Sequence, residues 1–219
     1  MAASIFSTSP GCKICLASAS SRRQELLAAT GVDFFVLKTG CPEARAPAGA
    51  HPDAYALATA AAKASAAMAI FAQTPTLQTA PTAIITCDTI VSLDNAIFGK
   101  PESETGLLTM LRLLNGRRHQ VFSGVCIVWP DGAKTQFVEA TAVHFADWPE
   151  ACLLAYAAAC RPYDKAGGYG IQDGGGFLAD KIEGAWTNVV GLPLARLLQE
   201  LLQAGMIVAG RPPASTSSA

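Results

Sequence analysis

Four short segments combine serine or glycine with charged side chains, and each lies where a predicted strand or helix begins or ends. Residues 18–23 form a serine-rich turn that enters a predicted helix and carries Arg22 and Arg23. Backbone N–H groups at a helix start lie at the positive end of its dipole, and arginines add paired donors, so this turn suits a phosphate. An ordinary capped helix with solvated arginines would use the same residues, and both interpretations stay open at this point.

The second segment places Asp88 and Thr89 directly after the apolar run at residues 82–87, which predicts a buried strand. A carboxylate at the mouth of such a strand is costly to bury unless it binds a metal or a proton, although a cap on the following turn would also explain it. A phosphatase with an aspartyl nucleophile needs a second aspartate two residues further on, where this chain has Ile90. That class of enzyme is therefore not favoured.

The third and fourth segments add cations and glycines. Lys100 is followed by a proline that fixes the backbone behind it, and its ammonium could reach a phosphate as a point charge. In residues 164–172, glycines allow close approach to a ligand, and the amide of Gln172 could hydrogen-bond to the edge of a base. Cations together with two acids, Asp88 and Glu43, in an otherwise neutral chain suit a triphosphate that carries Mg²⁺.

The composition limits the class of protein that carries these segments. Of 219 residues, 51% are apolar and 15% are charged, and the net charge is -1. These values exclude a disordered chain and any global attraction to nucleic acid or an anionic membrane. The longest apolar stretch, residues 54–72, carries Lys63 and many alanines, and no basic residue precedes Lys13. We therefore expect no membrane span, no secretory signal and a cytoplasmic location.

The seven cysteines are scattered and odd in number, which indicates reduced and mostly buried thiols. Cys12 and Cys15 form the one close pair, but their apolar neighbours predict a strand, and a zinc site would need a second pair. His51, His119 and His144 lack the spacing of metal ligands. We expect all three histidines to be structural or exposed.

Strand and helix signals alternate from residue 12 to residue 203, which predicts one α/β domain with a mixed, twisted sheet flanked by helices. Residues 1–10 and 204–219 are expected to be frayed tails of this domain, which spans 1–219. Two capping boxes are expected, at Ser21 with Gln24 and at Asp147 with Glu150. The expected strands cover 12–17, 33–37, 82–87, 90–93, 96–98, 119–129, 135–145 and a run ending at 182; the expected helices cover 21–28, 52–74, 102–114, 147–159 and 192–202.

Five motifs occur in a fixed order along the chain: Leu16-Ala17-Ser18-Ala19-Ser20-Ser21-Arg22-Arg23-Gln24-Glu25-Leu26-Leu27, Cys87-Asp88-Thr89-Ile90-Val91, Gly99-Lys100-Pro101, Asp164-Lys165-Ala166-Gly167-Gly168-Tyr169-Gly170-Ile171-Gln172 and Asn188-Val189-Val190-Gly191-Leu192-Pro193-Leu194. Together they resemble the Maf (septum-formation-inhibitor-like) family of nucleoside triphosphate pyrophosphatases, over about residues 12–203. The resemblance implies a fold of two lobes with an active-site cleft between them. It also implies hydrolysis between the α and β phosphates with a divalent cation, Mg²⁺ or Mn²⁺.

The resemblance further implies roles for single residues. The family's proton acceptor falls on Asp88, which with Glu43 would also hold the metal. The implied substrate-binding residues are Ser18, Ser20, Arg22, Arg23, Lys63, Thr89, Lys100, Lys165 and Gln172.

Subgroups of the family differ at three of these positions, which here carry Arg22, Thr89 and Gln172, the set seen in members that prefer dTTP and UTP. The resemblance therefore implies pyrimidine triphosphates, including modified ones, as substrates. The chain departs from the family pattern at Ser21, where a proline is usual, and at Glu43, which stands alone in a loop that usually carries paired acids.

The alternative hypothesis is a nucleotide-binding regulator of cell division that does not turn its ligand over. Such a regulator would share every phosphate-binding residue, but it has no need for an ionised carboxylate beside a polyanion, so Asp88 favours the enzyme. The expected partner is the nucleoside triphosphate, with no nucleic acid and no membrane. The family resemblance is compatible with a homodimer, although the sequence shows no zipper or large apolar stripe that would require one.

Overall fold

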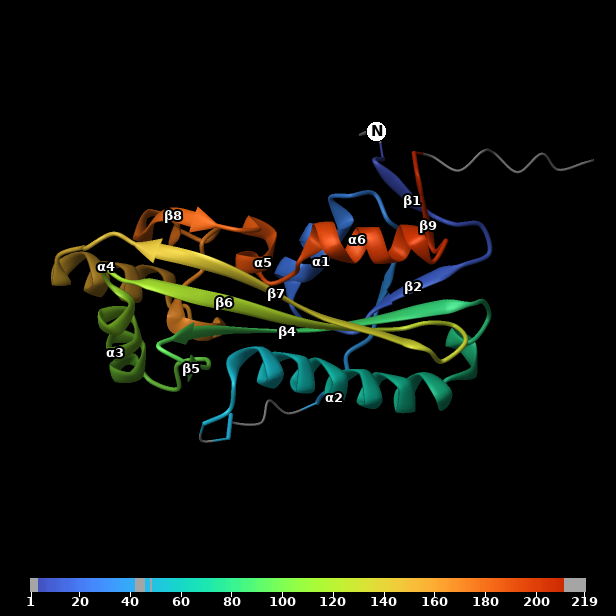
Figure 1. The fold of residues 1–219 in the computed structure, drawn as a ribbon, viewed down its shortest axis with the longest axis horizontal. Coiled ribbons are helices and arrows are strands. Elements are labelled where there is room, and N and C mark those ends of the chain that lie inside the picture. Colours follow the sequence, from blue (N-terminus) through green and yellow to red (C-terminus); the bar gives the residue numbers. More distant parts are fainter. Residues whose placement is uncertain (1–3, 42–45, 48, 211–219) are drawn as a thin grey trace, which may run out of the picture.

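A twisted sheet of seven strands runs the length of the molecule in the computed structural model, which describes residues 4–41, 46–47 and 49–210 (Figure 1). The strand order is β3-β2-β4-β6-β7-β8, and β5 pairs with β4 outside this path. β2 is parallel to both β3 and β4, and all other pairs are antiparallel, so the prediction of a mixed sheet is confirmed. The strands are β2 (Lys13–Leu16), β3 (Phe35–Val36), β4 (Thr82–Leu93), β5 (Ala96–Phe98), β6 (Arg118–Val128), β7 (Lys134–Phe145) and β8 (Ala179–Glu183).

Helices cover both faces of this sheet. α2 lies along one face, α1, α5 and α6 lie over the other, and α3 and α4 pack at one end (Figure 1). The helices are α1 (Ser21–Ala28), α2 (Pro52–Ala72), α3 (Glu104–Leu114), α4 (Glu150–Cys160), α5 (Trp186–Val190) and α6 (Leu194–Gln203), with short 3₁₀ turns η1 (Pro75–Leu77), η2 (Ala166–Gly168) and η3 (Gly176–Leu178).

The alanine content of the chain has a structural reason in α2. Ala56, Ala60, Ala64 and Ala67 are fully buried and repeat at helical spacing, so α2 presents a face of small side chains to the sheet. A Cβ at Gly124 on β6 would overlap the backbone of Ala56, which shows how closely helix and strand approach. Within the described residues α2 is also the one helix long and apolar enough to cross a membrane by length and composition alone, and here it packs on the sheet.

β4 is longer than the sequence predicted. We expected a strand to end at Asp88, whereas β4 continues from Thr82 to Leu93 because β6 pairs with it from Ile84 to Ser92. Asp88 therefore lies inside a strand rather than at its end, and this expectation was wrong. The hairpin that follows is confirmed, since β5 pairs with the end of β4.

The apolar core is divided into two main clusters. One gathers β2, α1, α6 and the first half of β4, and the other gathers α3, α4 and the second half of β4. β4 and β6 contribute to both, with Ile85 and Ile127 in the first and Val91 and Val121 in the second. Two cores joined by continuous strands agree with the predicted two-lobed fold.

The chain ends described by the structure are paired rather than frayed. β1 (Phe6–Thr8) pairs antiparallel with β9 (Ile207–Ala209), so the expectation of frayed tails was wrong for these residues. Such a contact spans nearly the whole sequence, and no local pattern indicates it.

Both expected capping boxes were also wrong. α1 begins at Ser21 itself, with Ser20 as the preceding residue and no side-chain cap. α4 is preceded by Pro149, and Asp147 instead accepts a hydrogen bond from Asn115 Nδ2 at 3.0 Å. The Asp147 carboxylate therefore has a partner other than the start of α4.

The cysteines are all free thiols, and Cys15 lies in β2 as predicted. Burial raises the pKa of Cys15 to about 12, so this thiol is neutral near pH 7. Three of the seven cysteines are buried and one is exposed, so burial of the thiols is less general than expected.

Candidate active site

A cavity of about 1160 Å³ opens at a gap along one edge of β4. β2 pairs with β4 only as far as Ile85, and β5 pairs with β4 only from Val91 onward. Within the described residues, the intervening stretch at 86–90 has no strand neighbour on this edge. The cavity passes through this gap, so side chains from both faces of the sheet line it. The carboxyl end of parallel strands is the usual ligand position in open α/β sheets.

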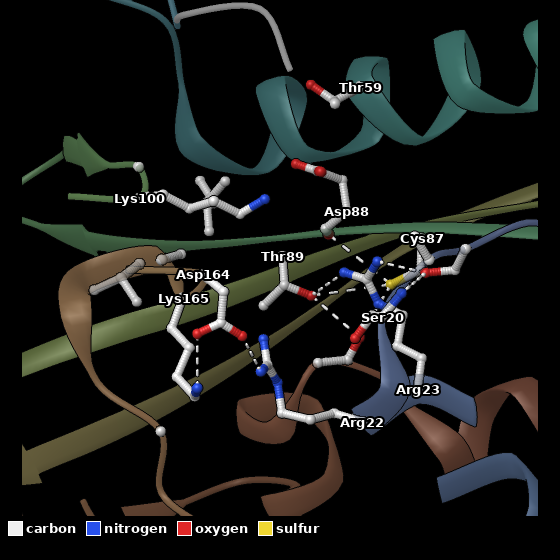
Figure 2. Close-up of a pocket in the computed structure, with 18 of the residues that line it drawn as sticks. Ser20, Arg22, Arg23, Thr59, Cys87, Asp88, Thr89, Lys100, Asp164 and Lys165 are labelled. Carbon is white, nitrogen blue, oxygen red and sulfur yellow. Dashed lines mark hydrogen bonds and ion pairs between the residues drawn. The ribbon is translucent and has the colours of Figure 1, made fainter. Parts of the chain in front are cut away.

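On the face toward α2, Asp88 forms an ion pair with Lys63, with 2.5 Å between Oδ1 and Nζ. Both side chains are largely buried, with 9% and 13% exposure. Tyr55, Thr59 and Lys63 follow one another at four-residue spacing on α2, and all three line the cavity. Lys100 extends toward the same face of β4 (Figure 2).

On the opposite face, Thr89 points away from Asp88, as consecutive residues of a strand do (Figure 2). Arg23 holds this side of the cavity together. Its Nε donates to Gly191 O at 2.8 Å, Nη1 donates to Ser18 Oγ at 3.3 Å, and Nη2 donates to Thr89 Oγ1 at 3.0 Å. Ser18 thus binds an arginine and the backbone N–H of Ser20 rather than capping α1.

A third group of charges comes from the glycine-rich loop after α4. Arg22 Nη1 contacts one carboxylate oxygen of Asp164 at 2.6 Å, and Lys165 Nζ contacts the other at 2.8 Å (Figure 2). Partial burial alone would raise the pKa of Asp164, but the hydrogen bonds from Lys165 and Arg22 lower it to about 2. Lys165 also lies 3.2 Å from Asp173. Asp164 therefore links two cations that come from distant parts of the chain.

The structure brings almost all predicted site residues together. Every one that it describes lines the cavity: Ser18, Ser20, Arg22, Arg23, Lys63, Asp88, Thr89, Lys100, Lys165 and Gln172. Glu43, the predicted second metal ligand, lies outside the described residues.

The sequence analysis missed several residues of the cavity. Tyr55 and Thr59 could have been found, because they precede Lys63 by eight and four residues on a predicted helix. Asp164 was part of a recognised motif but received no role. Ser123 lies behind the cavity wall, 2.8 Å from Thr89, and carried no local signal, because only the pairing of β4 with β6 brings the two residues together.

His119 is buried and has a structural role. Its Nε2 lies 2.8 Å from the hydroxyl of Tyr169, and burial lowers the pKa of His119 to about 4, so the ring is neutral near pH 7. Tyr169 lines the cavity, so this buried contact supports the glycine-rich loop. Among the described residues, no three His, Cys, Asp or Glu side chains gather as a metal site.

The sequence matches the family described as Maf-like protein over residues 13–204. This chain belongs to the Maf family. The match covers every element that lines the cavity in this Maf protein, from α1 to α5.

Three relatives of this Maf protein carry the name dTTP/UTP pyrophosphatase. The protein from Oleidesulfovibrio alaskensis is 44% identical over 200 residues, covering 90% of this chain and 87% of its own. The protein from Nitratidesulfovibrio vulgaris is 43% identical and covers 89% of each chain. The protein from Exiguobacterium sibiricum is 39% identical and covers 85% of this chain and 89% of its own.

Among solved structures, a nucleoside-triphosphatase / dITP/XTP pyrophosphatase from Mycobacterium abscessus aligns with a TM-score of 0.35 and 18% identity. The alignment covers 63% of this chain and 76% of the other. A likeness of this size carries no argument about the site.

Proposed function

We propose that this Maf protein is a hydrolase that cleaves dTTP and UTP between the α and β phosphates and releases the monophosphate and pyrophosphate. The observation that carries the proposal is a single cavity in which Asp88 lies among six cationic side chains: Arg22, Arg23, Lys38, Lys63, Lys100 and Lys165. The cations favour a chain of phosphates, whereas a buried carboxylate in such a site is of use only if it takes part in the chemistry. The names of the three relatives support the same reaction.

In this proposal Asp88 is the general base. Lys63 holds its Oδ1, so Oδ2 can receive the proton of a water molecule that attacks phosphorus in line. Lys100 and Lys165 neutralise the charge that develops on the leaving pyrophosphate, and Arg23 binds the phosphate groups equally in the ground state and in the transition state. Because β4 and α2 fix the carboxylate and the ammonium before substrate binds, most of the rate enhancement comes from preorganised charge and positioning.

The residues present fit a divalent cation that arrives with the triphosphate. Mg²⁺ prefers oxygen ligands and usually combines one or two carboxylates with phosphate oxygens. Asp88 supplies a carboxylate beside the cationic side chains of the cavity, and Glu43 is the proposed second ligand. When bound, the cation would neutralise phosphate charge and polarise the bond that breaks.

We assign recognition of the base to the rim formed by Gln172 and Arg22. Gln172 is exposed on the cavity wall, and its amide offers one donor and one acceptor edge. A pyrimidine with a carbonyl and an N–H on adjacent positions is complementary to that edge. The amide accounts for acceptance of both thymine and uracil, because the methyl group that distinguishes them makes no hydrogen bond.

A panel assay tests the proposed function. Purified protein is incubated with each of dTTP, UTP, dCTP, dATP and dGTP in the presence of Mg²⁺ or Mn²⁺, and pyrophosphate and inorganic phosphate are measured separately. We expect pyrophosphate from dTTP and UTP at rates at least tenfold above those of the purines. Release of inorganic phosphate alone, or tight binding of dTTP without any product, would contradict the proposal, and the second result would favour the regulator.

We place the reaction in the cytoplasm. All seven cysteines are free in the structure, including the exposed Cys160. Free thiols of this kind persist in reducing compartments, where the pool of nucleoside triphosphates is also found.

A further inference from the structure

We propose that Ser123 is a positioning residue for the phosphate-binding Arg23, and that it acts through the hydroxyl of Thr89; this inference rests on the function proposed above. Ser123 lies on β6 directly opposite Thr89 of β4, and its Oγ is 2.8 Å from Thr89 Oγ1. Its side chain is fully buried between apolar residues of β6. Burying a hydroxyl in an apolar strand costs free energy unless the hydroxyl is hydrogen-bonded. The contact with Thr89, which lines the cavity, offsets this cost for Ser123.

The hydroxyl of Thr89 has three hydrogen-bond partners within the protein. Arg23 Nη2 donates to Thr89 Oγ1 at 3.0 Å, and Thr89 Oγ1 lies 3.2 Å from Gly191 O and 2.8 Å from Ser123 Oγ, where either hydroxyl can be the donor. Ser123 Oγ also lies 3.4 Å from Asn188 O, to which it can donate. A hydroxyl donates one hydrogen bond and accepts two, so most of the capacity of Thr89 is taken by the protein rather than left for a nucleobase. Thr89, which the family resemblance connects with base choice, acts on the substrate through Arg23 instead.

Arg23 itself keeps part of its capacity for a ligand. Its guanidinium has five N–H groups, of which three bind Gly191, Ser18 and Thr89. One N–H remains on each terminal nitrogen, and two parallel donors of this kind match the oxygens of a phosphate. The three protein contacts fix the plane of the guanidinium and hence the direction of this pair of donors. Ser123 controls that direction at the Thr89 contact.

Removal of the Ser123 hydroxyl tests the inference. In S123A, we expect the KM for dTTP and the Kd for inorganic pyrophosphate each to rise about fivefold, the scale of one hydrogen bond, with kcat changed less than about twofold. T89V should behave alike, whereas T89S, which keeps the hydroxyl, should stay close to wild type. The matched control is S7A, which removes a buried serine hydroxyl bonded to Gly210 O away from the cavity, and should leave both constants unchanged.

A double-mutant cycle separates positioning from a general loss of structure. In an R23A background, S123A should add less than about twofold to the KM, because the group it positions is already absent. A further fivefold rise in that background would overturn the proposal. A change in the ratio of dTTP to dCTP turnover in T89V would also overturn it, because that result means Thr89 contacts the base.

The binding of pyrophosphate keeps this test apart from the test of the proposed function. Isothermal titration of pyrophosphate into wild type, S123A and S7A needs no turnover. Weaker binding in S123A alone supports the positioning role even if dTTP is not hydrolysed. Equal binding in all three proteins contradicts the positioning role even if dTTP is the substrate.

Discussion

Two ion pairs of nearly equal length line the cavity, and they differ in their surroundings. Lys63 and Asp88 are 2.5 Å apart and largely buried, whereas Arg22 and Asp164 are 2.6 Å apart, with Asp164 61% exposed. Removing one partner of a buried pair leaves an uncompensated charge, while an exposed pair is screened by water and contributes little. Burial rather than distance therefore decides what each pair contributes to the protein.

The elements that carry the two pairs differ in the same way. Asp88 lies inside the long strand β4 and Lys63 lies on α2, which packs closely against the sheet. Asp164 lies in a loop between α4 and η2, and it reaches Arg22 across the cavity. The buried pair thus joins two elements that are packed firmly against each other. The exposed pair joins a loop to α1, and these two segments can separate at a small cost in free energy.

The largest effect is expected at the buried pair, on catalysis. In D88N, kcat should fall about 10²–10⁴-fold, because the amide cannot accept the proton of the attacking water. Steady-state kinetics with dTTP measure the loss, and far-UV circular dichroism checks that the fold is intact. Turnover close to wild type would remove Asp88 from the role of base.

The next effect concerns the stability that the buried pair provides. In K63M, the free energy of unfolding should fall by about 3–5 kcal/mol, because the carboxylate of Asp88 stays buried without its partner. Urea unfolding measures this change. The double variant K63M/D88N is the control and should recover much of the loss, since an amide needs no counter-ion. A change below about 1 kcal/mol in K63M would mean that this pair stabilises the protein no more than an exposed pair does.

A smaller effect is expected at the exposed pair. In D164N, the free energy of unfolding should change by less than about 1 kcal/mol, because water screens the lost charge. D173N is the matched control, since Asp173 also contacts Lys165 but does not contact Arg22. If D164N lost more than about 2 kcal/mol in urea unfolding while D173N did not, the contrast between the two pairs would fail.

The smallest effect is the pH dependence of the exposed pair. The pKa of Asp164 is lowered to about 2 in the folded protein, from 3.8, so its ionised form is favoured by folding. That contribution is present above the unfolded pKa and is lost as the pH falls through the folded value. The difference in unfolding free energy between wild type and D164N should be constant from about pH 5 to pH 8 and should shrink below about pH 4. Any change of this difference near neutral pH would contradict the assignment.

Much of the site could be predicted from the sequence because its charged residues stand in short motifs. The serine-rich turn with Arg23, the Asp88 segment and the glycine-rich loop with Lys165 each carry local signals, and the resemblance to a family supplied Lys63. What local signals could not supply is the arrangement around β4. The polar pair Asp88-Thr89 suggested the end of a strand, but pairing with β6 continued the strand through it.

The missed features share one physical cause, which is contact between residues distant in the sequence. Ser123 meets Thr89 only because two long strands are in register, and β1 meets β9 only because both chain ends reach the same edge of the fold. Asp164 was visible in its motif, yet its role depends on Arg22, which stands 142 residues away. Residue propensity and spacing report only on neighbours along the chain, so they could not predict these contacts.

The close approach of α2 to β6 limits how the substrate range of this protein can be changed by directed evolution. No side chain larger than the existing ones fits at Ala56 or Gly124, because helix and strand backbones already touch there. Tyr55 and Thr59 lie on the same helix but face the cavity. A library that varies those two positions would reshape the pocket, whereas one that varies the alanine face would yield mostly unfolded protein.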